Sequence, residues 1–150
     1  MSTLQERIEN NSKVEFISKL VAGEDIDAYN YLIDLAGALR IIDDIFDEFN
    51  NVSAQQCCGL VELLFIKIPA NKFYKKHQDL LFSQHVTMWN AWEASNELSQ
   101  GDEVDKLYAH VLRDYVNEIL PLVALLTQNH DKMKQANGVI RSLFKKQLGE

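Results

Sequence analysis

Three aspartates and a glutamate stand close together in one short stretch of the chain, Asp43, Asp44, Asp47 and Glu48. Asp43 and Asp47 are one helical turn apart, so in a helix their carboxylates lie one above the other on the same face. Like charges at this spacing repel each other, and acids near the C-terminus of a helix also oppose its dipole. A divalent cation would remove both penalties, because Mg²⁺ prefers oxygen ligands and is commonly held by one or two carboxylates together with substrate phosphates. The stretch therefore predicts a Mg²⁺ or Mn²⁺ site at Asp43 and Asp47.

The same acids have a second interpretation as the solvated side of an amphipathic helix. Such a helix needs a polar face, and runs of charge on that face are usually solvated. On a helical wheel Arg40 lies between the two acidic pairs. The spacing alone does not decide between a metal site and a solvated helix face.

The run Asp43-Asp44-Ile-Phe-Asp47 resembles the DDxxD motif of class I terpenoid and isoprenyl diphosphate synthases. In that all-helical family the motif lies on a helix that lines the central cavity, and its first and last aspartates bind Mg²⁺ ions that hold the substrate diphosphate. The resemblance implies that Asp43 and Asp47 are metal ligands, that Asp44 assists, and that the ligand is a small molecule with a diphosphate. Members of the family are usually much longer than the 150 residues here, so the bundle would be a reduced one.

Cyclases of that family carry a second metal motif made of Asn, Ser and Glu. Its nearest counterpart here is Asn96, Ser99 and Glu103, in which the first interval is one residue short. A different resemblance concerns Glu93 and Glu97, which resemble the acidic helices of all-α nucleotide pyrophosphohydrolases, another class of small Mg²⁺-binding bundles. An enzyme of that kind is a further alternative.

Polar residues also fall on the apolar side of the single helix predicted from Asn71 to about Ser99, within its residues 77–99. Its apolar face holds Leu81, Met88 and two tryptophans, and His85 lies on the same face. An inward polar group must find a hydrogen-bond partner or incur about 1–3 kcal/mol, so these groups are either paired structurally or line a pocket. If this helix faced the acidic one, the two would form an apolar cavity with a polar metal end, as small-molecule sites often do. The predicted pocket residues are His85, Trp89, Trp92, Asn96, Ser99 and Arg40. Alternatively, the tryptophans are ordinary core residues.

Helix start and stop signals divide the chain into the elements that must position these residues. Helix starts are predicted at the capping residues Ser12, Asp25, Ser53, Asn71, Asp102 and either Asn129 or Asp131. Gly23 is expected to close the first helix, and the second is expected to run to about Phe49. The third should stop before Pro69, and Pro121 should kink a later helix. The result is an all-α bundle of about six helices.

Periodicity also predicts which residues enter the core. In the second helix the apolar face comprises Tyr31, Leu32, Leu35, Leu39, Ile42, Ile45, Phe46 and Phe49. In the helix after Asp102 the residues predicted as core are Tyr108, Leu112, Tyr115 and Ile119. Phe82 and Trp89 are likewise predicted on the apolar face of the helix over residues 77–99.

Composition bounds the partners and the setting of the protein. The length predicts one helical domain, residues 1–150, and 47% hydrophobic with 25% charged residues is ordinary for a globular protein. The first fifty residues carry eleven acids and four bases, which accounts for the whole net charge of −7. An acidic chain without a basic stripe argues against nucleic acid. The polar start and the short apolar runs predict neither a secretory signal nor a membrane span, and adjacent Cys57 and Cys58 are expected to be reduced, so a cytoplasmic protein is expected.

Two classes of function therefore remain open. In the first, the protein binds a divalent metal and binds or acts on a small diphosphate, with Asp43 and Asp47 as ligands rather than bases. Whether such a protein is an enzyme is left open. In the second, it is a non-enzymatic interaction or oligomerisation protein, in which the acidic first third and an apolar helix face recognise another protein or a second copy of this chain.

Overall fold

The computed structural model describes residues 3–144, and these residues form helices and no strand. The predicted all-α class is confirmed. The chain divides into two compact units, unit 1 within residues 1–76 and unit 2 within residues 77–150, and each is described by itself. Within the part of the chain that the structure describes, no helix has the length and apolar character needed to cross a membrane.

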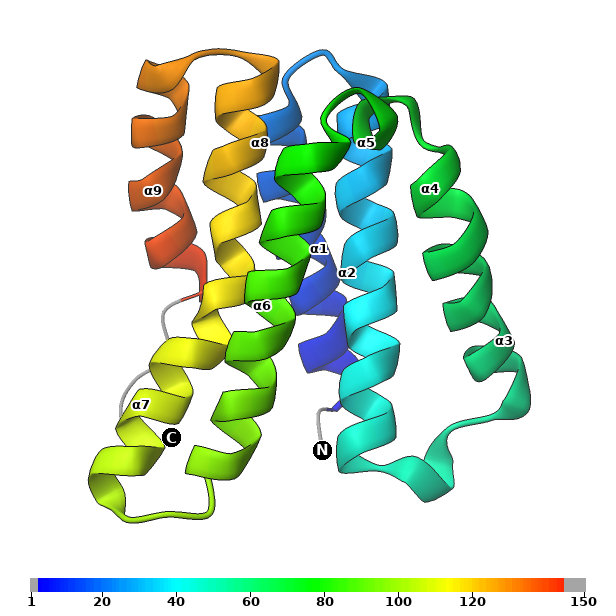
Figure 1. Cartoon of the computed structure of the whole chain (residues 1–150), viewed down its shortest axis with the longest axis vertical. Coiled ribbons are helices and arrows are strands. Elements are labelled where there is room, and N and C mark those ends of the chain that lie inside the picture. The colour runs from blue at the N-terminus through cyan, green and yellow to red at the C-terminus, as the bar shows by residue number, and fades with distance from the viewer. Residues whose placement is uncertain (1–2, 145–150) are drawn as a thin grey trace. The chain divides into compact units, whose positions relative to one another are not determined.

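The second helix is the centre of unit 1. Helix α1 (Leu4–Ala22) and helix α2 (Ile26–Asp47) run antiparallel and pack against each other (Figure 1). Helix α2 also contacts the segments that follow it, which are η1 (Phe49–Asn51), α3 (Ala54–Glu62), η2 (Leu63–Lys67), α4 (Ile68–Ala70) and α5 (Lys72–Lys76). Tyr31 of α2 is fully buried against the rings of Phe73 and Tyr74. The acidic stretch therefore lies at the C-terminal end of the helix that organises this unit.

Local capping chemistry sets the helix starts of unit 1, with one correction. Asp25 and Ser53 cap α2 and α3 as predicted, and Gly23 ends α1 with a φ of 60°. The start predicted at Ser12 is wrong, because Thr3 and Glu6 form an earlier capping box and Ser12 lies inside α1. The Ser12 hydroxyl instead donates to the carbonyl of Ile8, as serines within helices often do.

The helix before Pro69 does not stop where the sequence predicts. It continues through a π-helical segment, η2, into the short helix α4, which contains Pro69. In η2 the Ile68 N–H donates to the carbonyl of Leu63, five residues back. A proline has no N–H, and in a regular α-helix its ring would crowd the carbonyl four residues earlier. The wider π turn accommodates that conflict without ending the helix.

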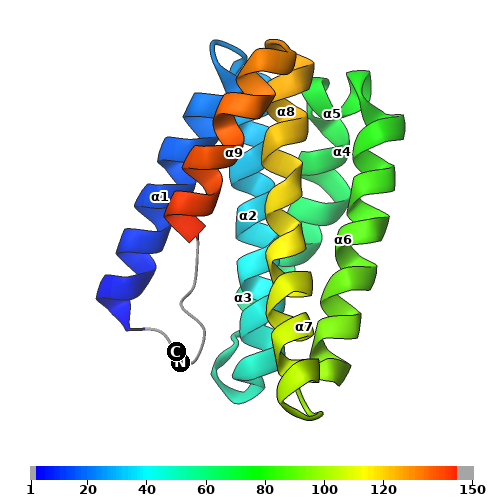
Figure 2. The ribbon, with the colours of Figure 1, turned by 90° about the vertical axis from the view of Figure 1, so that its left-hand side faces the viewer.

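Unit 2 consists of two helical pairs. Helix α6 (Gln78–Leu98) packs antiparallel against α7 (Glu103–Asp114), and after η3 (Tyr115–Glu118) helix α8 (Ile119–Thr127) packs against α9 (His130–Phe144) (Figure 2). Their cores include the buried residues Leu81, Met88, Ala109, Val123 and Ile140.

The caps of unit 2 largely follow the prediction. Asp102 caps α7 in a capping box with Asp105, and Asn129 accepts from the Lys132 N–H at the start of α9. The single helix expected from Asn71 to about Ser99 is interrupted at His77, whose φ of −115° and ψ of 25° are not helical. Asn71 does cap α5 as predicted.

The interruption expected from Pro121 appears one turn earlier in the chain. Helix α8 contains Pro121, and the tighter 3-10 segment η3 immediately precedes it. The ring of Pro121 would crowd the carbonyl of Asn117 in a regular α-helix, which explains why the irregular turn lies there.

Several residues predicted as core lie at the surface. On α2, Tyr31, Leu32 and Leu35 are buried, but Phe46 is largely exposed, and so is Phe49, which lies beyond α2 in η1. In unit 2 Ile119 is buried, whereas residues expected beside the core are exposed, namely Phe82, Trp89, Tyr108 and Tyr115. Periodicity alone therefore did not show which apolar residues other helices cover.

Candidate functional site

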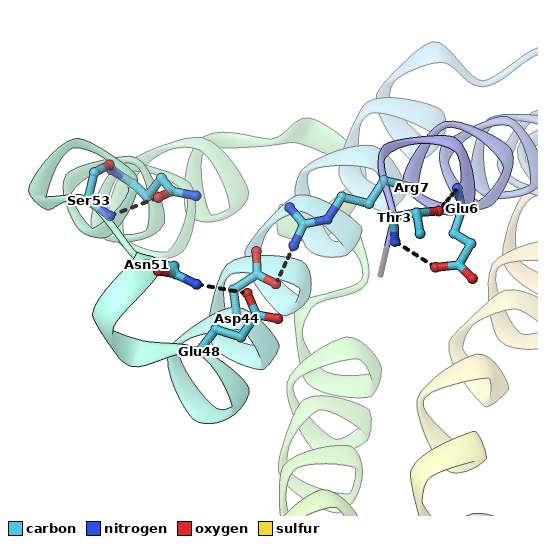
Figure 3. Close-up of polar contacts among 8 residues, drawn as sticks. Thr3, Glu6, Arg7, Asp44, Glu48, Asn51 and Ser53 are labelled. Carbon is cyan, nitrogen blue, oxygen red and sulfur yellow. Dashed lines mark hydrogen bonds and ion pairs between the residues drawn. The ribbon is translucent and has the colours of Figure 1, made fainter. Parts of the chain in front are cut away.

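The carboxylates at the acidic end of α2 differ in their exposure. Asp43 and Asp47 are exposed. Asp44 is partly buried and accepts from the Arg7 guanidinium of α1 across 3.3 Å, with side-chain exposures of 17% for Asp44 and 35% for Arg7 (Figure 3). The aspartate predicted to assist a metal is thus held by an arginine of the neighbouring helix.

Two further hydrogen bonds lie at the C-terminal end of α2. The Glu48 N–H donates to the carbonyl of Asp44, and the Asn51 amide donates to a Glu48 carboxylate oxygen at 3.4 Å (Figure 3). The last turn of α2 contains no basic residue, so its own side chains do not offset the acids beside the negative end of the helix dipole. Arg7 supplies that compensation from α1. Arg40 is partly buried on α2.

Asp43 and Asp47 remain the two predicted metal ligands, and the described residues provide no third one beside them. Within residues 3–144, no group of three or more His, Cys, Asp or Glu side chains is arranged to hold a metal ion. Two carboxylates with waters and a phosphate ligand would still be an ordinary environment for Mg²⁺. Binding of Mg²⁺ or Mn²⁺ at Asp43 and Asp47 therefore stays a prediction.

The polar residues of α6 are mostly held by local hydrogen bonds. Ser99 donates to the carbonyl of Asn96 at 2.8 Å, and Arg113 of α7 donates to the amide oxygen of Asn96 at 3.2 Å. Arg113 also donates to the hydroxyl of fully buried Ser95, so it joins α6 to α7. The amide nitrogen of Asn96 is buried and has no hydrogen-bond partner within the described residues. Arg113 was missed by sequence reasoning, since nothing in its spacing reveals its partners on α6.

The remaining pocket candidates differ in their exposure. Burial lowers the pKa of His85, which lies partly buried on α6. Trp92 is also partly buried, and its ring lies 5.2 Å from that of Trp89, which is exposed. Arg40, Asp43 and Asp47 belong to unit 1, whereas His85 and the tryptophans belong to unit 2. The predicted shared cavity stays a prediction, as does the hydrolase-like role of Glu93 and Glu97, which are exposed.

Both units also expose apolar residues at their surface. On η2 three consecutive large side chains are exposed, those of Leu64, Phe65 and Ile66. Other exposed sets lie on α6 (Phe82, Val86 and Trp89) and on α7 (Val104, Leu107, Tyr108 and Val111). A run of exposed apolar residues is unfavourable in water unless it serves a contact. The apolar run before Pro69 is visible in the sequence, but its exposure is not, because exposure depends on tertiary packing.

Comparisons with known proteins add no relative. No protein-family model, no curated protein and no solved structure matched the chain.

Proposed function

We propose that this protein is a helical interaction protein that binds another helix through apolar faces left uncovered by its own fold. The observation that carries the proposal is the outer face of α7. Val104, Leu107, Tyr108 and Val111 repeat at the spacing of one helix face, and each is between 46% and 69% exposed. Their exposed parts amount to roughly 400 Å², which is within the range of the largest apolar patches on monomers, patches that are often functional.

The chemistry of α7 supports docking rather than internal packing. Its opposite side holds buried Ala109 against the rest of unit 2, together with Arg113, which bonds to α6. Helix α7 is thus already fixed by one side. The large apolar side chains on the other side contribute to stability only when a partner removes them from water.

The test replaces exposed apolar residues of α7 and measures two quantities. In Leu107→Glu/Val111→Glu, we expect the free energy of unfolding to stay within about 0.5 kcal/mol of wild type for each site, because surface changes usually have small effects. We expect any concentration-dependent self-association, measured by sedimentation equilibrium, to weaken. Ala109→Glu, on the buried side, is the matched control and should destabilise strongly. A monomeric wild type together with strong destabilisation by the outer pair would refute the proposal, because the face would then be part of the core.

A second candidate function rests on the acidic end of α2. Asp43 and Asp47 are exposed one turn apart, which supports binding of Mg²⁺ or Mn²⁺ together with a small diphosphate. The test is thermal unfolding of wild type and Asp43→Asn/Asp47→Asn with millimolar metal, then with pyrophosphate added. A site stabilises by mass action, so only the wild type should shift, and pyrophosphate should enlarge the shift. Glu93→Gln/Glu97→Gln is the matched control; equal shifts in all three proteins would argue against a site on α2.

A further inference from the structure

The exposed side of α6 carries a seam whose spacing is that of a coiled coil. Phe82, Val86 and Trp89 are 59%, 53% and 47% exposed, and their intervals of four and three residues place them on one line along the helix. The same alternation continues to exposed Asp79 before them and exposed Glu93 after them. An apolar centre is thus bounded by a carboxylate at each end. We call these five residues the α6 seam.

Charge decides which partner this seam fits. Helix α6 contains Asp79, Glu93 and Glu97 but no lysine or arginine. Two copies of the α6 seam would oppose like charges in either orientation, since acids stand at both ends. A helix with apolar seam residues and a cation near each end would meet opposite charges instead. Self-pairing is therefore disfavoured, and a basic amphipathic helix is favoured.

An aromatic ring accompanies the carboxylate at each end of the α6 seam. At the first end, Asp79 and Phe82 lie together beside a shallow, open depression with Gln78 and Ser83. The aliphatic stem of a lysine or arginine could lie on the Phe82 ring while its charged head reaches the Asp79 carboxylate. At the other end, the exposed ring of Trp89 lies one turn before Glu93, so one guanidinium could stack on the ring and pair with the acid.

We infer that the α6 seam binds a basic amphipathic helix of another protein, with the partner's apolar residues on Phe82, Val86 and Trp89 and its cations at Asp79 and Glu93. This inference rests on the proposed function and names the partner class for one of its surfaces. The two acids are separated by about 21 Å of helix, so the partner needs cations about four turns apart.

The probe is a synthetic peptide of about three heptads with leucine at its seam positions and lysine at both ends. The comparison peptide has glutamate in place of each lysine. Trp89 and Trp92 are the only tryptophans of the chain, so intrinsic fluorescence reports directly on this helix. We expect a blue shift with the lysine peptide, affinity at least about tenfold above that of the glutamate peptide, and weaker binding in salt.

Variants locate the binding. Asp79→Lys/Glu93→Lys should reverse the preference, so that the glutamate peptide binds better, and the neutral pair Asp79→Asn/Glu93→Gln should remove most of the discrimination. Glu15→Lys, at an exposed position of α1 outside the proposed binding faces, is the charge-matched control and should leave the preference unchanged, whereas Val111→Glu tests whether the peptides bind α7 instead. Circular dichroism of each variant establishes that it is folded.

Other results would overturn the inference. Equal binding of both peptides to wild type would refute a basic partner, and binding lost in Val111→Glu but kept in the seam variants would move the site to α7 while leaving the proposed function intact. No binding of either peptide, combined with a monomeric wild type and a destabilised Leu107→Glu/Val111→Glu, would refute both.

Discussion

The contact between Arg7 and Asp44 allows a quantitative test of how α1 is held on α2. At 3.3 Å the direct attraction at a partly exposed site is several kcal/mol, but loss of hydration and side-chain ordering cancel most of it. Exposed pairs contribute about 0.2–1 kcal/mol, whereas removing one partner of a fully buried pair costs about 3–5 kcal/mol. With exposures of 35% and 17%, this pair lies between those limits, and we expect a coupling energy of about 1 kcal/mol.

The two single substitutions should differ in size. Arg7→Gln leaves a partly buried carboxylate among other acids at the negative end of a helix, so we expect a loss of about 1–2 kcal/mol. Asp44→Asn also relieves that repulsion, so its loss should be smaller, about 0.5 kcal/mol or less.

The assay is a double-mutant cycle. The free energy of unfolding of each variant is measured in urea, with circular dichroism as the signal, at low and at high salt. The same cycle on the exposed pair Lys106 and Glu103, whose nitrogen and oxygen lie 3.2 Å apart, is the control and should give about 0.5 kcal/mol or less. Additive effects of Arg7→Gln and Asp44→Asn, or a larger loss from Asp44→Asn, would refute the reasoning.

Three further predictions concern stability. Asn71→Ala removes a cap bond to the Tyr74 N–H and a 2.8 Å bond to the carbonyl of Asp27, so urea unfolding should show a loss of about 1–2.5 kcal/mol. Asn71→Asp keeps the cap acceptor and loses only the donor to Asp27, so an Asn71→Asp variant as stable as wild type would contradict the second bond. Ile140→Ala empties a fully buried site and should cost about 2–5 kcal/mol by the same assay, and a near-neutral result would mean that α9 is not packed on α8. Burial lowers the pKa of His85 below 6.5, so the unfolded chain binds more protons between the folded pKa and 6.5, and stability should rise with pH in that window and level off above it. His85→Gln should remove this part of the pH dependence, measured by urea midpoints; an unchanged slope would contradict it.

The features that sequence predicted well are those decided within a few residues. Asp25, Ser53 and Asp102 cap their helices because a capping side chain needs only the backbone of the next turn. The error at Ser12 arose because the chain offers two capping boxes, and local chemistry cannot show that the helix already began at Thr3. The all-α class followed from the same kind of local signal.

Features that depend on distant neighbours were beyond the reach of the sequence. A helical wheel places Tyr108 on an apolar face, but whether another helix covers that face depends on tertiary packing. In the structure Tyr108 is left exposed. The partnership of Arg7 with Asp44 joins positions 37 residues apart, and that of Arg113 with Ser95 joins positions 18 apart. Asp43 and Asp47 lie one turn apart near the end of α2, as their spacing predicts, because that relation needs only the helix itself.

The π turn at Leu63–Lys67 has a consequence for how the chain tolerates changes of length. A π turn contains one residue more than an α turn, while the helix before it and the helix after it stay in phase. If one residue of this turn were deleted and Pro69 were replaced by a residue with an N–H, the segment would become an ordinary helix. Buried Ile68 would still be directed inward. The same loss within α2 would rotate every later side chain of that helix by about 100°. Natural length variants of this chain should therefore gain or lose a residue at this turn more readily than within α2.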